Sequence, residues 1–251
     1  MGSDDREPVR INRLFSMLGI CSRREADRLI SSGRVDINGR KALPGDMVYS
    51  NDRLSLDGRP VDISRGEAQV ILAFNKPRGI VCTSSKKDRA PNIIDYIGYP
   101  THIYPIGRLD KDSEGLILLT NMGELVNRIN RAENHHEKEY EVELEAPVPE
   151  GFAERLMKGV IIEVPDRGRV RAGCRSARKT GEKSLNIVLT EGMNRQIRRM
   201  CGSLGGRVRR LKRVRIMNIR LGDLGVGELR ELDEREKAEI LKLTGADAKS
   251  C

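Results

Sequence analysis

The chain has 251 residues, with 46 lysines and arginines against 37 aspartates and glutamates, which gives a net charge of +9. This length allows one or two domains with a real core, and no apolar run approaches the roughly 18 residues that span a bilayer. We therefore expect no membrane-spanning segment and no membrane partner. The N-terminus has no apolar signal core and carries early acids, so we expect a cytoplasmic protein.

Cysteine and histidine are both sparse. The five cysteines form no C-x-x-C pair, and their number is odd. The sequence therefore predicts neither a disulfide framework nor a zinc cluster. The three histidines do not supply a metal set either, and we expect no metal.

The positive charge is concentrated in one segment, Gly192–Gly222, which we call the basic window. It holds ten basic residues and no acid, whereas the rest of the chain has 36 basic and 37 acidic residues. Nine of the ten are arginines, whose planar fork of donors suits phosphate. A solvated basic face is the alternative, but a surface built for solubility mixes both signs. The basic window therefore favours a polyanionic partner such as nucleic acid.

The first part of the chain predicts two helices and a hairpin. Apolar residues over 11–18 follow helical spacing. Ser22 and Glu25 predict a capping box for a second helix. Val35–Ile37 alternates like a strand, and Asn38-Gly39 is a strong hairpin-turn signal.

The rest of the chain predicts strands and helices that do not alternate regularly. The predicted strands are Gln69–Phe74, Gly115–Thr120, Lys138–Glu145, Leu185–Leu189 and Val214–Leu221. The predicted helices run from Pro149 to Met157, from Ile197 to Leu204 and onward from a cap at Asp233. This order favours an α+β fold, with a mixed and mostly antiparallel sheet flanked by helices, over a doubly wound fold. Residues 61–67 read as a linker.

The run RINRLFSMLGICSRREADRLISSGRVDINGRK resembles an S4 RNA-binding domain, which we place at residues 8–62. The resemblance implies that the two helices present a basic face to structured RNA. On the motif positions lie Arg13, Ser22, Arg23, Arg24 and Arg28. Without the resemblance, Ser22 and Glu25 are only a helix cap, and the arginines stay unexplained.

Three acids crowd the segment GRLDKDSEGLILLT. Asp110, Asp112, Glu114 and Gly115 match the start of a calcium-binding loop, but Asn121 stands where that loop needs glutamate. Apolar residues fill the ligand positions between. We therefore expect no calcium site. The chain also has no Walker GK[ST] sequence, and no Ser-His-Asp or Cys-His arrangement is evident.

GRLDKDSEGLILLT instead resembles the central motif of RNA pseudouridine synthases. FNKPRGIVCT, HEKEYEVELE and EGMNRQIRRM resemble companion motifs of the branch that modifies ribosomal RNA and carries an S4 domain. The resemblance predicts a catalytic domain at residues 68–244. Within that branch, RAENHHEKEY and RVRIMNI are most similar to the RluF type, which acts on the large subunit.

The resemblance implies an isomerisation that needs no cofactor and no metal. A uridine is flipped out, its glycosidic bond breaks, the uracil turns, and a carbon–carbon bond forms through C5. Asp110 matches the catalytic aspartate, Arg198 its expected cationic partner, and Tyr140 the tyrosine that stacks on the uracil. Ile197 would pack on the base, and Arg108 could fill the gap left in the stack. Whether the aspartate acts at the sugar or at the base stays open.

Several assignments have a plainer reading from the residues alone. Tyr140 alternates with Val142 and Leu144 and would be a core residue. Arg198 would be one phosphate contact among many, and we expect its neighbours Arg195 and Arg199 to contact the substrate too.

The expected partner is ribosomal RNA, in particular 23S RNA or a large-subunit precursor. The alternatives are a synthase acting on 16S RNA or transfer RNA, and a non-catalytic RNA-binding factor in ribosome assembly. We expect a monomer.

Overall fold

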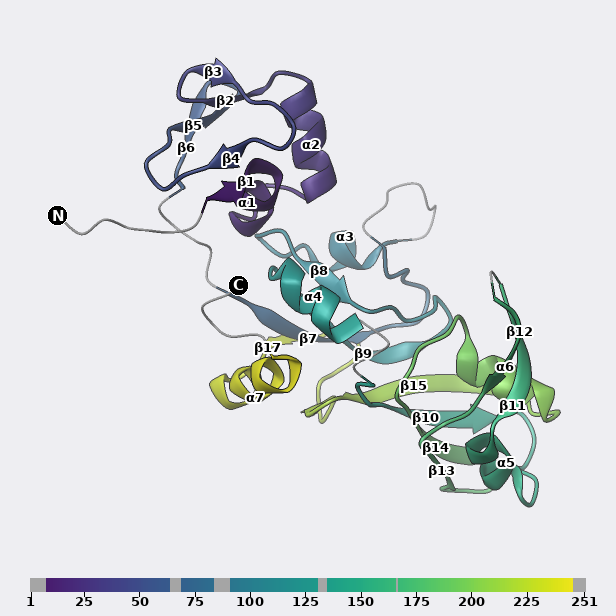
Figure 1. Ribbon diagram of the computed structural model, residues 1–251. Coiled ribbons are helices and arrows are strands. Elements are labelled where there is room, and N and C mark those ends of the chain that lie inside the picture. The colour runs from purple at the N-terminus through teal and green to yellow at the C-terminus, as the bar shows by residue number, and fades with distance from the viewer. Residues whose placement is uncertain (1–7, 64–68, 84–90, 131–134, 166, 246–251) are drawn as a thin grey trace. The chain divides into compact units, whose positions relative to one another are not determined.

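The computed structural model describes residues 8–63, 69–83, 91–130, 135–165 and 167–245 (Figure 1). The chain divides into two compact units. The first is built mainly from residues up to Val70, together with the segments Tyr99–Tyr104 and Asn121–Gly123. Much of the predicted linker falls outside the described residues. Among the helices of the described part, none is long and apolar enough to cross a membrane.

The first unit contains the predicted pair of helices, α1 (Ile11–Met17) and α2 (Arg23–Ser31). A four-stranded sheet has the order β3-β2-β5-β6, and β1 pairs with β4 in a separate ribbon. The strands are β1 (Val9–Arg10), β2 (Val35–Ile37), β3 (Arg40–Lys41), β4 (Met47–Val48), β5 (Leu54–Leu56) and β6 (Arg59–Val61). The apolar faces of both helices meet the sheet in one core, which includes Ile11, Phe15, Ala26, Ile30 and Val35.

The local signals at the start of α2 are only partly realised. Ser22 caps the helix, because its hydroxyl accepts from the Glu25 amide at 3.2 Å. The Glu25 carboxylate does not return the bond as a capping box requires, since it accepts instead from Arg28 Nη1 at 2.8 Å. Asn38 and Gly39 have φ values of 51° and 82° and close the β2–β3 hairpin as predicted.

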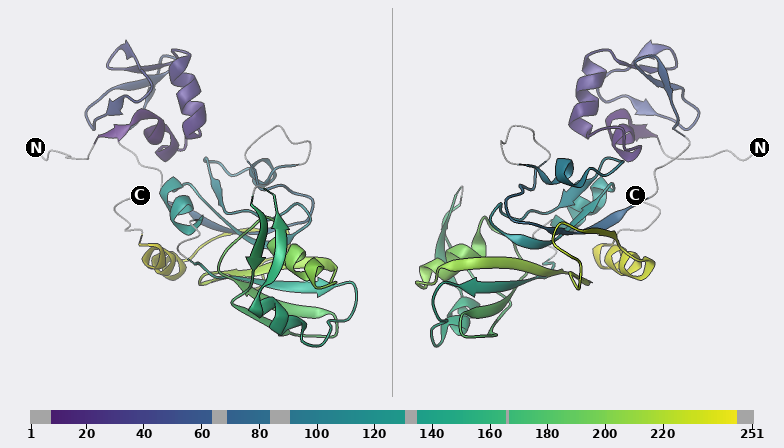
Figure 2. Two further views of the ribbon diagram at one scale, coloured as in Figure 1. Left: turned by 45° about the vertical axis from the view of Figure 1, so that its right-hand side comes forward. Right: turned by 180° about the vertical axis from the view of Figure 1, so that it is seen from behind.

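The second unit is built on a nine-stranded sheet of order β13-β14-β10-β15-β9-β7-β17, with β16 on β15 and β8 on β9 (Figures 1 and 2). β15 and β9 pair in parallel, whereas β7–β9, β10–β14 and β10–β15 are antiparallel, so the described sheet is mixed and mostly antiparallel, as predicted. Its strands are β7 (Ile71–Lys76), β8 (Tyr104–Ile106), β9 (Glu114–Thr120), β10 (Lys138–Leu144), β13 (Ser176–Lys179), β14 (Ser184–Leu189), β15 (Val208–Ile216), β16 (Ile219–Arg220) and β17 (Leu229–Glu231).

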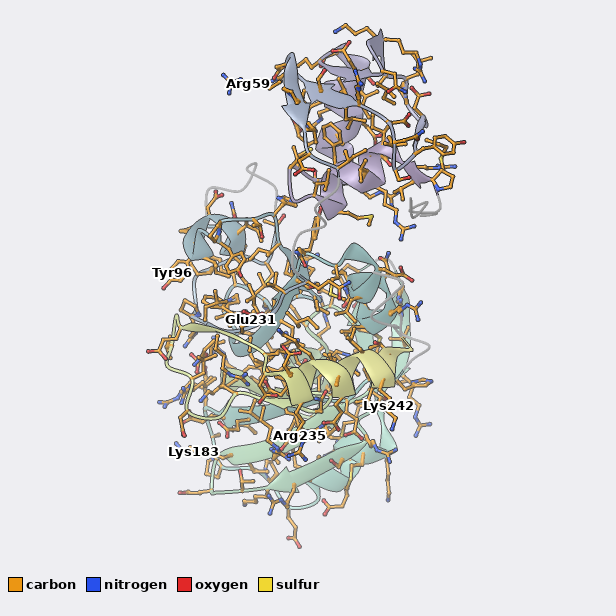
Figure 3. The ribbon with its side chains drawn as sticks, turned by 90° about the vertical axis from the view of Figure 1, so that its left-hand side faces the viewer. Arg59, Tyr96, Lys183, Glu231, Arg235 and Lys242 are labelled. Atoms are coloured by element: carbon orange, nitrogen blue, oxygen red, sulfur yellow. The ribbon has the colours of Figure 1, made fainter. Side chains whose placement is uncertain are left out.

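Helices and a hairpin complete this unit. The helices are α3 (Ile93–Ile97), α4 (Gly123–Asn130), α5 (Phe152–Lys158), α6 (Gln196–Ser203) and α7 (Glu234–Thr244). β11 (Val160–Val164) and β12 (Gly168–Ala172) form a separate hairpin, against which α6 packs. At the surface, Tyr96 of α3 lies with its ring centroid 5.9 Å from that of Phe74 (Figure 3).

For two strands the predicted bounds differ from those in the structure. The strand predicted at Gln69–Phe74 continues to Lys76, and all six residues of β7 are buried. The strand predicted at Val214–Leu221 begins at Val208 instead and reverses at Met217, whose φ is 51°. Both errors have one cause: charged residues occupy positions in the interior of the sheet, where a pattern based on hydropathy does not expect them.

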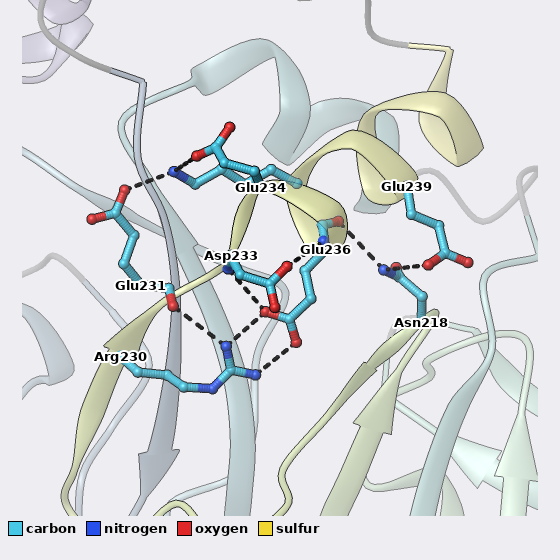
Figure 4. A network of polar contacts seen from close by, with 8 residues as sticks. Asn218, Arg230, Glu231, Asp233, Glu234, Glu236 and Glu239 are labelled. Carbon is cyan, nitrogen blue, oxygen red and sulfur yellow. Dashed lines mark hydrogen bonds and ion pairs between the residues drawn. The ribbon is translucent and has the colours of Figure 1, made fainter.

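The last helix begins as predicted. Asp233 and Glu236 form a full capping box at the start of α7 (Figure 4). Arg230 binds the Glu236 carboxylate with two hydrogen bonds of 2.7 and 2.8 Å, and Asn218 donates to the Glu236 carbonyl. These contacts tie the helix to β17 and to the turn after β15.

Candidate active site

Asp110 lies in the loop between β8 and β9, which spans residues 107–113. Its side chain is 31% exposed, so it is reachable from solvent. The loop is held tightly, because the Ser113 amide donates to the Asp110 carbonyl at 3.0 Å. Buried Leu109 precedes Asp110, and its amide donates to Cys82 Sγ at 3.4 Å.

Two arginines from the start of α6 meet this loop. Arg195 binds Asp112 with two bonds of 2.9 and 3.1 Å, and its Nη1 lies 3.7 Å from Asp110 Oδ2. Arg198 donates to the Asp112 carbonyl at 3.1 Å, and its Nε lies 3.4 Å from Asp112 Oδ2. Within ion-pair distance, Arg195 approaches Asp110 and Arg198 holds Asp112. The charge of Asp110 also acts on Arg198, and the expected pairing of these two residues stays a prediction.

Arg195 and Arg198 reach different aspartates because they occupy different positions on α6. Arg195 is the N-cap of α6, with a left-handed φ of 51°. Arg198 lies within the helix and is 11% exposed, and its Nη1 also donates to the Val208 carbonyl at 3.0 Å. This second bond fixes the Arg198 guanidinium between β15 and Asp112.

Arg195 and Arg198 together keep the Asp112 carboxylate ionised. Burial by itself raises the pKa of Asp112, but the hydrogen bond from Arg195 and the charges of Arg198 and Arg195 outweigh it and bring the pKa below 3.8. Asp112 is thus ionised at neutral pH. Asp112 is therefore the carboxylate that holds both arginines beside the loop.

A buried lysine holds the other side of the loop. Lys76, at the end of β7, is fully buried, and its Nζ donates to the carbonyls of Pro77 at 2.9 Å and Ser113 at 2.8 Å. Burial lowers the pKa of Lys76, and nearby acids including Asp110 partly offset this. Sequence reasoning missed this residue. The signal available was a lysine directly after an apolar strand, in the segment FNKPRG.

Tyr140 and Ile197 are both buried, with 8% and 4% of their surfaces exposed. Tyr140 lies on β10, opposite Arg213 of β15 and Ile187 of β14. Since β15 lies between β10 and β9, one strand separates Tyr140 from the strand that follows the Asp110 loop. Ile197 belongs to the buried face of α6.

The remaining predicted substrate contacts differ from one another. The Arg108 side chain is exposed next to Asp110 in the loop. Arg199 is engaged by protein, because it donates to the carbonyls of Asn194 at 3.0 Å and Glu163 at 2.7 Å. It therefore braces β11, and a role in binding substrate stays a prediction.

A cleft of about 570 Å³ opens beside the loop. Its lining includes Asp112, Arg195 and Arg198, together with Arg78 and the segment 205–209. This volume lies within the range of about 300–1,000 Å³ typical of ligand sites. The lining holds five arginines against two carboxylates, Asp112 and Glu145, and this excess of positive charge suits a phosphate-bearing substrate.

In the first unit, three of the predicted RNA contacts lie at the start of α2. Arg23 and Arg24 are exposed, and neither forms an ion pair with another described residue. Arg28 pairs with Glu25, and Ser22 caps the helix. Arg13 is exposed on α1. Over the described ranges, no three His, Cys, Asp or Glu side chains are grouped as a metal site would require.

Comparison with known proteins agrees with this geometry. Residues 70–203 match the family described as RNA pseudouridylate synthase, and residues 9–54 match the S4 domain. The chain is 45% identical over 235 residues to the dual-specificity RNA pseudouridine synthase RluF of Escherichia coli K12, covering 94% of this chain and 79% of that protein. It is 32% identical over 237 residues to the ribosomal large subunit pseudouridine synthase B of Bacillus subtilis, covering 93% and 96%.

A solved structure gives the same result. A crystal structure of a pseudouridylate synthase has 28% sequence identity and a TM-score of 0.64, over 94% of this chain and 99% of the other. The chain therefore belongs to the RNA pseudouridylate synthase family, as an enzyme of the RluF type that carries an S4 domain and acts on RNA.

Proposed function

We propose that this enzyme isomerises a uridine in 23S ribosomal RNA and that Asp110 is its catalytic residue. The observation that carries the proposal is the position of Asp110: a partly exposed carboxylate, 3.7 Å from Arg195, which itself lines a cationic cleft. The relative named for the ribosomal large subunit supports the choice of RNA.

Each of the candidate site residues has an expected role in the isomerisation of uridine. The bond between C1′ and N1 breaks, and a bond between C1′ and C5 forms. The hydrogen on C5 leaves to water as a proton, and N1 takes up a proton, so the product is an isomer. Asp110 acts on the flipped nucleotide, and Arg195 keeps a cation next to its carboxylate. Tyr140 is the residue expected to stack on the base. Arg108, exposed beside Asp110, contacts the RNA from which the base has left.

Transfer RNA is a second candidate substrate. The name of the RluF relative specifies two specificities, which fits an enzyme that accepts a second class of RNA besides ribosomal RNA. Both substrates would use the same cleft, and the enzyme would work as a monomer in the cytoplasm without metal or cofactor.

The test uses RNA transcripts with tritium at C5 of uridine, because each isomerisation releases one tritium to water. Wild-type protein is incubated with 23S RNA, 16S RNA and transfer RNA. We expect release from 23S RNA, no release by Asp110→Asn, and an RNA affinity of that variant within a few-fold of wild type. Asp223→Asn, a change outside the cleft lining, is the control and should keep wild-type activity.

Release from 16S RNA or transfer RNA alone would refute the 23S assignment and keep the role of Asp110. Full activity of Asp110→Asn on any of the three RNAs would refute that role.

A further inference from the structure

Arg213 is a buried cation for which the proposed chemistry has no task. It lies in the middle of β15 and is 2% exposed. No carboxylate of the described residues lies within ion-pair distance of its guanidinium, which donates instead to backbone carbonyls. Burying a charge is costly unless the charge is paired and hydrogen-bonded, so the hydrogen bonds of Arg213 indicate what it does.

Those hydrogen bonds reach both sides of the Asp110 loop. Arg213 Nε donates to the Leu116 carbonyl at 2.7 Å, in β9 just after the loop. Its Nη1 donates to the Arg108 carbonyl at 3.4 Å, two residues before Asp110. Nη2 is buried and finds no acceptor among the described residues.

The chain approaches Arg213 closely at Gly115. Gly115 is the parallel partner of Arg213, and a Cβ at Gly115 would lie 2.3 Å from the Arg213 carbonyl oxygen and 2.7 Å from its amide nitrogen. The φ of Gly115 is 102°, which glycine adopts without strain. Only glycine therefore lets β15 approach β9 closely enough to bring the guanidinium to the loop.

Arg213 also faces the strand of Tyr140. The two residues are direct antiparallel partners on β15 and β10. Side chains of such partners leave the sheet on the same face, with Cβ atoms about 4.5–5.5 Å apart. Arg213 is thus a neighbour of Tyr140 and a donor to the backbone of the Asp110 loop.

We propose that Arg213 is a positioning residue, which fixes the Asp110 loop relative to Tyr140 so that the two side chains engage the same flipped base. The proposal rests on the proposed roles of Asp110 and Tyr140. This role requires the two directed donors of the guanidinium, and a positive charge alone is not enough. Lysine cannot reproduce two donors directed at Arg108 and Leu116.

The test compares Arg213→Lys with Arg215→Met in the full-length protein. Arg215 lies two residues further along β15 and pairs with Glu137 and Glu139, without contact to the loop, so it controls for general weakening of the strand. The single-turnover rate of tritium release and the affinity for the same RNA transcript are measured for each. We expect Arg213→Lys to slow release about 100-fold, the cost of a misplacement of about 1 Å, with affinity changed less than about threefold.

Hydrogen exchange of residues 107–116 gives a second readout that does not depend on activity. We expect exchange about tenfold faster in Arg213→Lys, since the loop loses a hydrogen bond from a charged donor, and unchanged in Arg215→Met. Wild-type release rate together with wild-type exchange in Arg213→Lys would overturn the proposal. Equal losses of release rate and of protection from exchange in both variants would also overturn the proposal, because they would show that Arg213 only stabilises the sheet. If no RNA is isomerised by wild type, the proposed function fails, and the exchange data alone decide on Arg213.

Discussion

Helix α2 and the basic window are both rich in arginine, but their side chains have different surroundings. On α2, Arg23 and Arg24 are exposed and form no ion pair within the described structure. In the basic window, most arginines already bind protein groups. Arg195 and Arg198 bind Asp112, Arg213 binds backbone carbonyls, and Arg199 binds β11.

Much of the remaining charge of the basic window is offset by β10 and the residue after it. Arg215 lies 2.7 Å from Glu139, Arg209 lies 2.8 Å from Glu143, and Arg207 lies 3.2 Å from Glu145. We call these three pairs the charge ladder. Glu139 and Glu143 alternate with buried Tyr140 and Val142 along β10, so these two acids share one face of the strand. The far end of the ladder reaches the candidate cleft, because Glu145, Arg207 and Arg209 belong to its lining.

A run of arginines in the sequence therefore does not establish a free basic surface. The basic window contains no acid, but antiparallel pairing places an acidic strand directly beside it. We therefore expect α2 to contribute more to RNA affinity, and the basic window more to the geometry of the site.

We expect the largest effect from a change at Arg198, which tests whether the basic window acts on the geometry of the site more than on RNA affinity. We expect Arg198→Lys to lower the rate of isomerisation about 100-fold, because lysine cannot hold the Asp112 and Val208 carbonyls together. RNA affinity should change less than about threefold. Single-turnover kinetics and a binding titration on the same transcript measure both quantities. A loss that falls mainly in affinity would place Arg198 among the phosphate contacts instead.

The charge ladder should contribute to stability at its least exposed pair. Arg215 and Glu139 are 15% and 20% exposed, and hydrogen bonds to charged groups contribute about 1.5–3 kcal/mol. We expect Glu139→Gln to lower the free energy of unfolding by about 1–3 kcal/mol in urea. Glu143→Gln, whose partner Arg209 is 66% exposed, should cost less than about 1 kcal/mol. Equal costs would contradict the role of burial.

The same pair has a predicted pH dependence. The hydrogen bond from Arg215 is the main cause that lowers the pKa of Glu139 below 4.5, while burial opposes it. A carboxyl with a lowered pKa stabilises the fold above its unfolded pKa, and this contribution is lost as pH falls below about 4.5. The difference in unfolding free energy between wild type and Glu139→Gln should therefore shrink from pH 6 to pH 3. A constant difference would refute the linkage.

How far the sequence predicts this molecule depends on the kind of signal. Elements with regular apolar spacing or a cap, such as α1, β9 and α7, are predicted within a few residues. The start of β15 and the end of β7 are predicted at the wrong residues, because Arg213 and Lys76 are charged residues inside the sheet. Asp110 could be found from its motif. The sequence predicts a substrate contact for Arg195, but its approach to Asp110 could not be predicted, since that depends on how α6 meets the loop in the folded protein.

A smaller effect concerns Lys138, two residues before Tyr140 on β10. Burial, with a contribution from the charge of Arg213, lowers the pKa of Lys138 to about 8 from 10.5. Between these values the unfolded chain binds the proton and the folded protein does not, so unfolding free energy should rise with pH over about 8 to 10.5. We expect this rise to be weaker in Lys138→Met. The same slope in both proteins would show that Lys138 is not its source.

The salt dependence of RNA binding tests the division between α2 and the basic window most directly. Each phosphate contact contributes about 0.7–0.9 to the slope of log K against log salt. We expect the double variant Arg23→Gln with Arg24→Gln to reduce the slope by about 1.4–1.8. Arg210→Gln with Arg215→Gln, both ion-paired in the structure, should reduce it by less than about 0.5. Equal reductions, or a larger one for the second pair, would contradict this division.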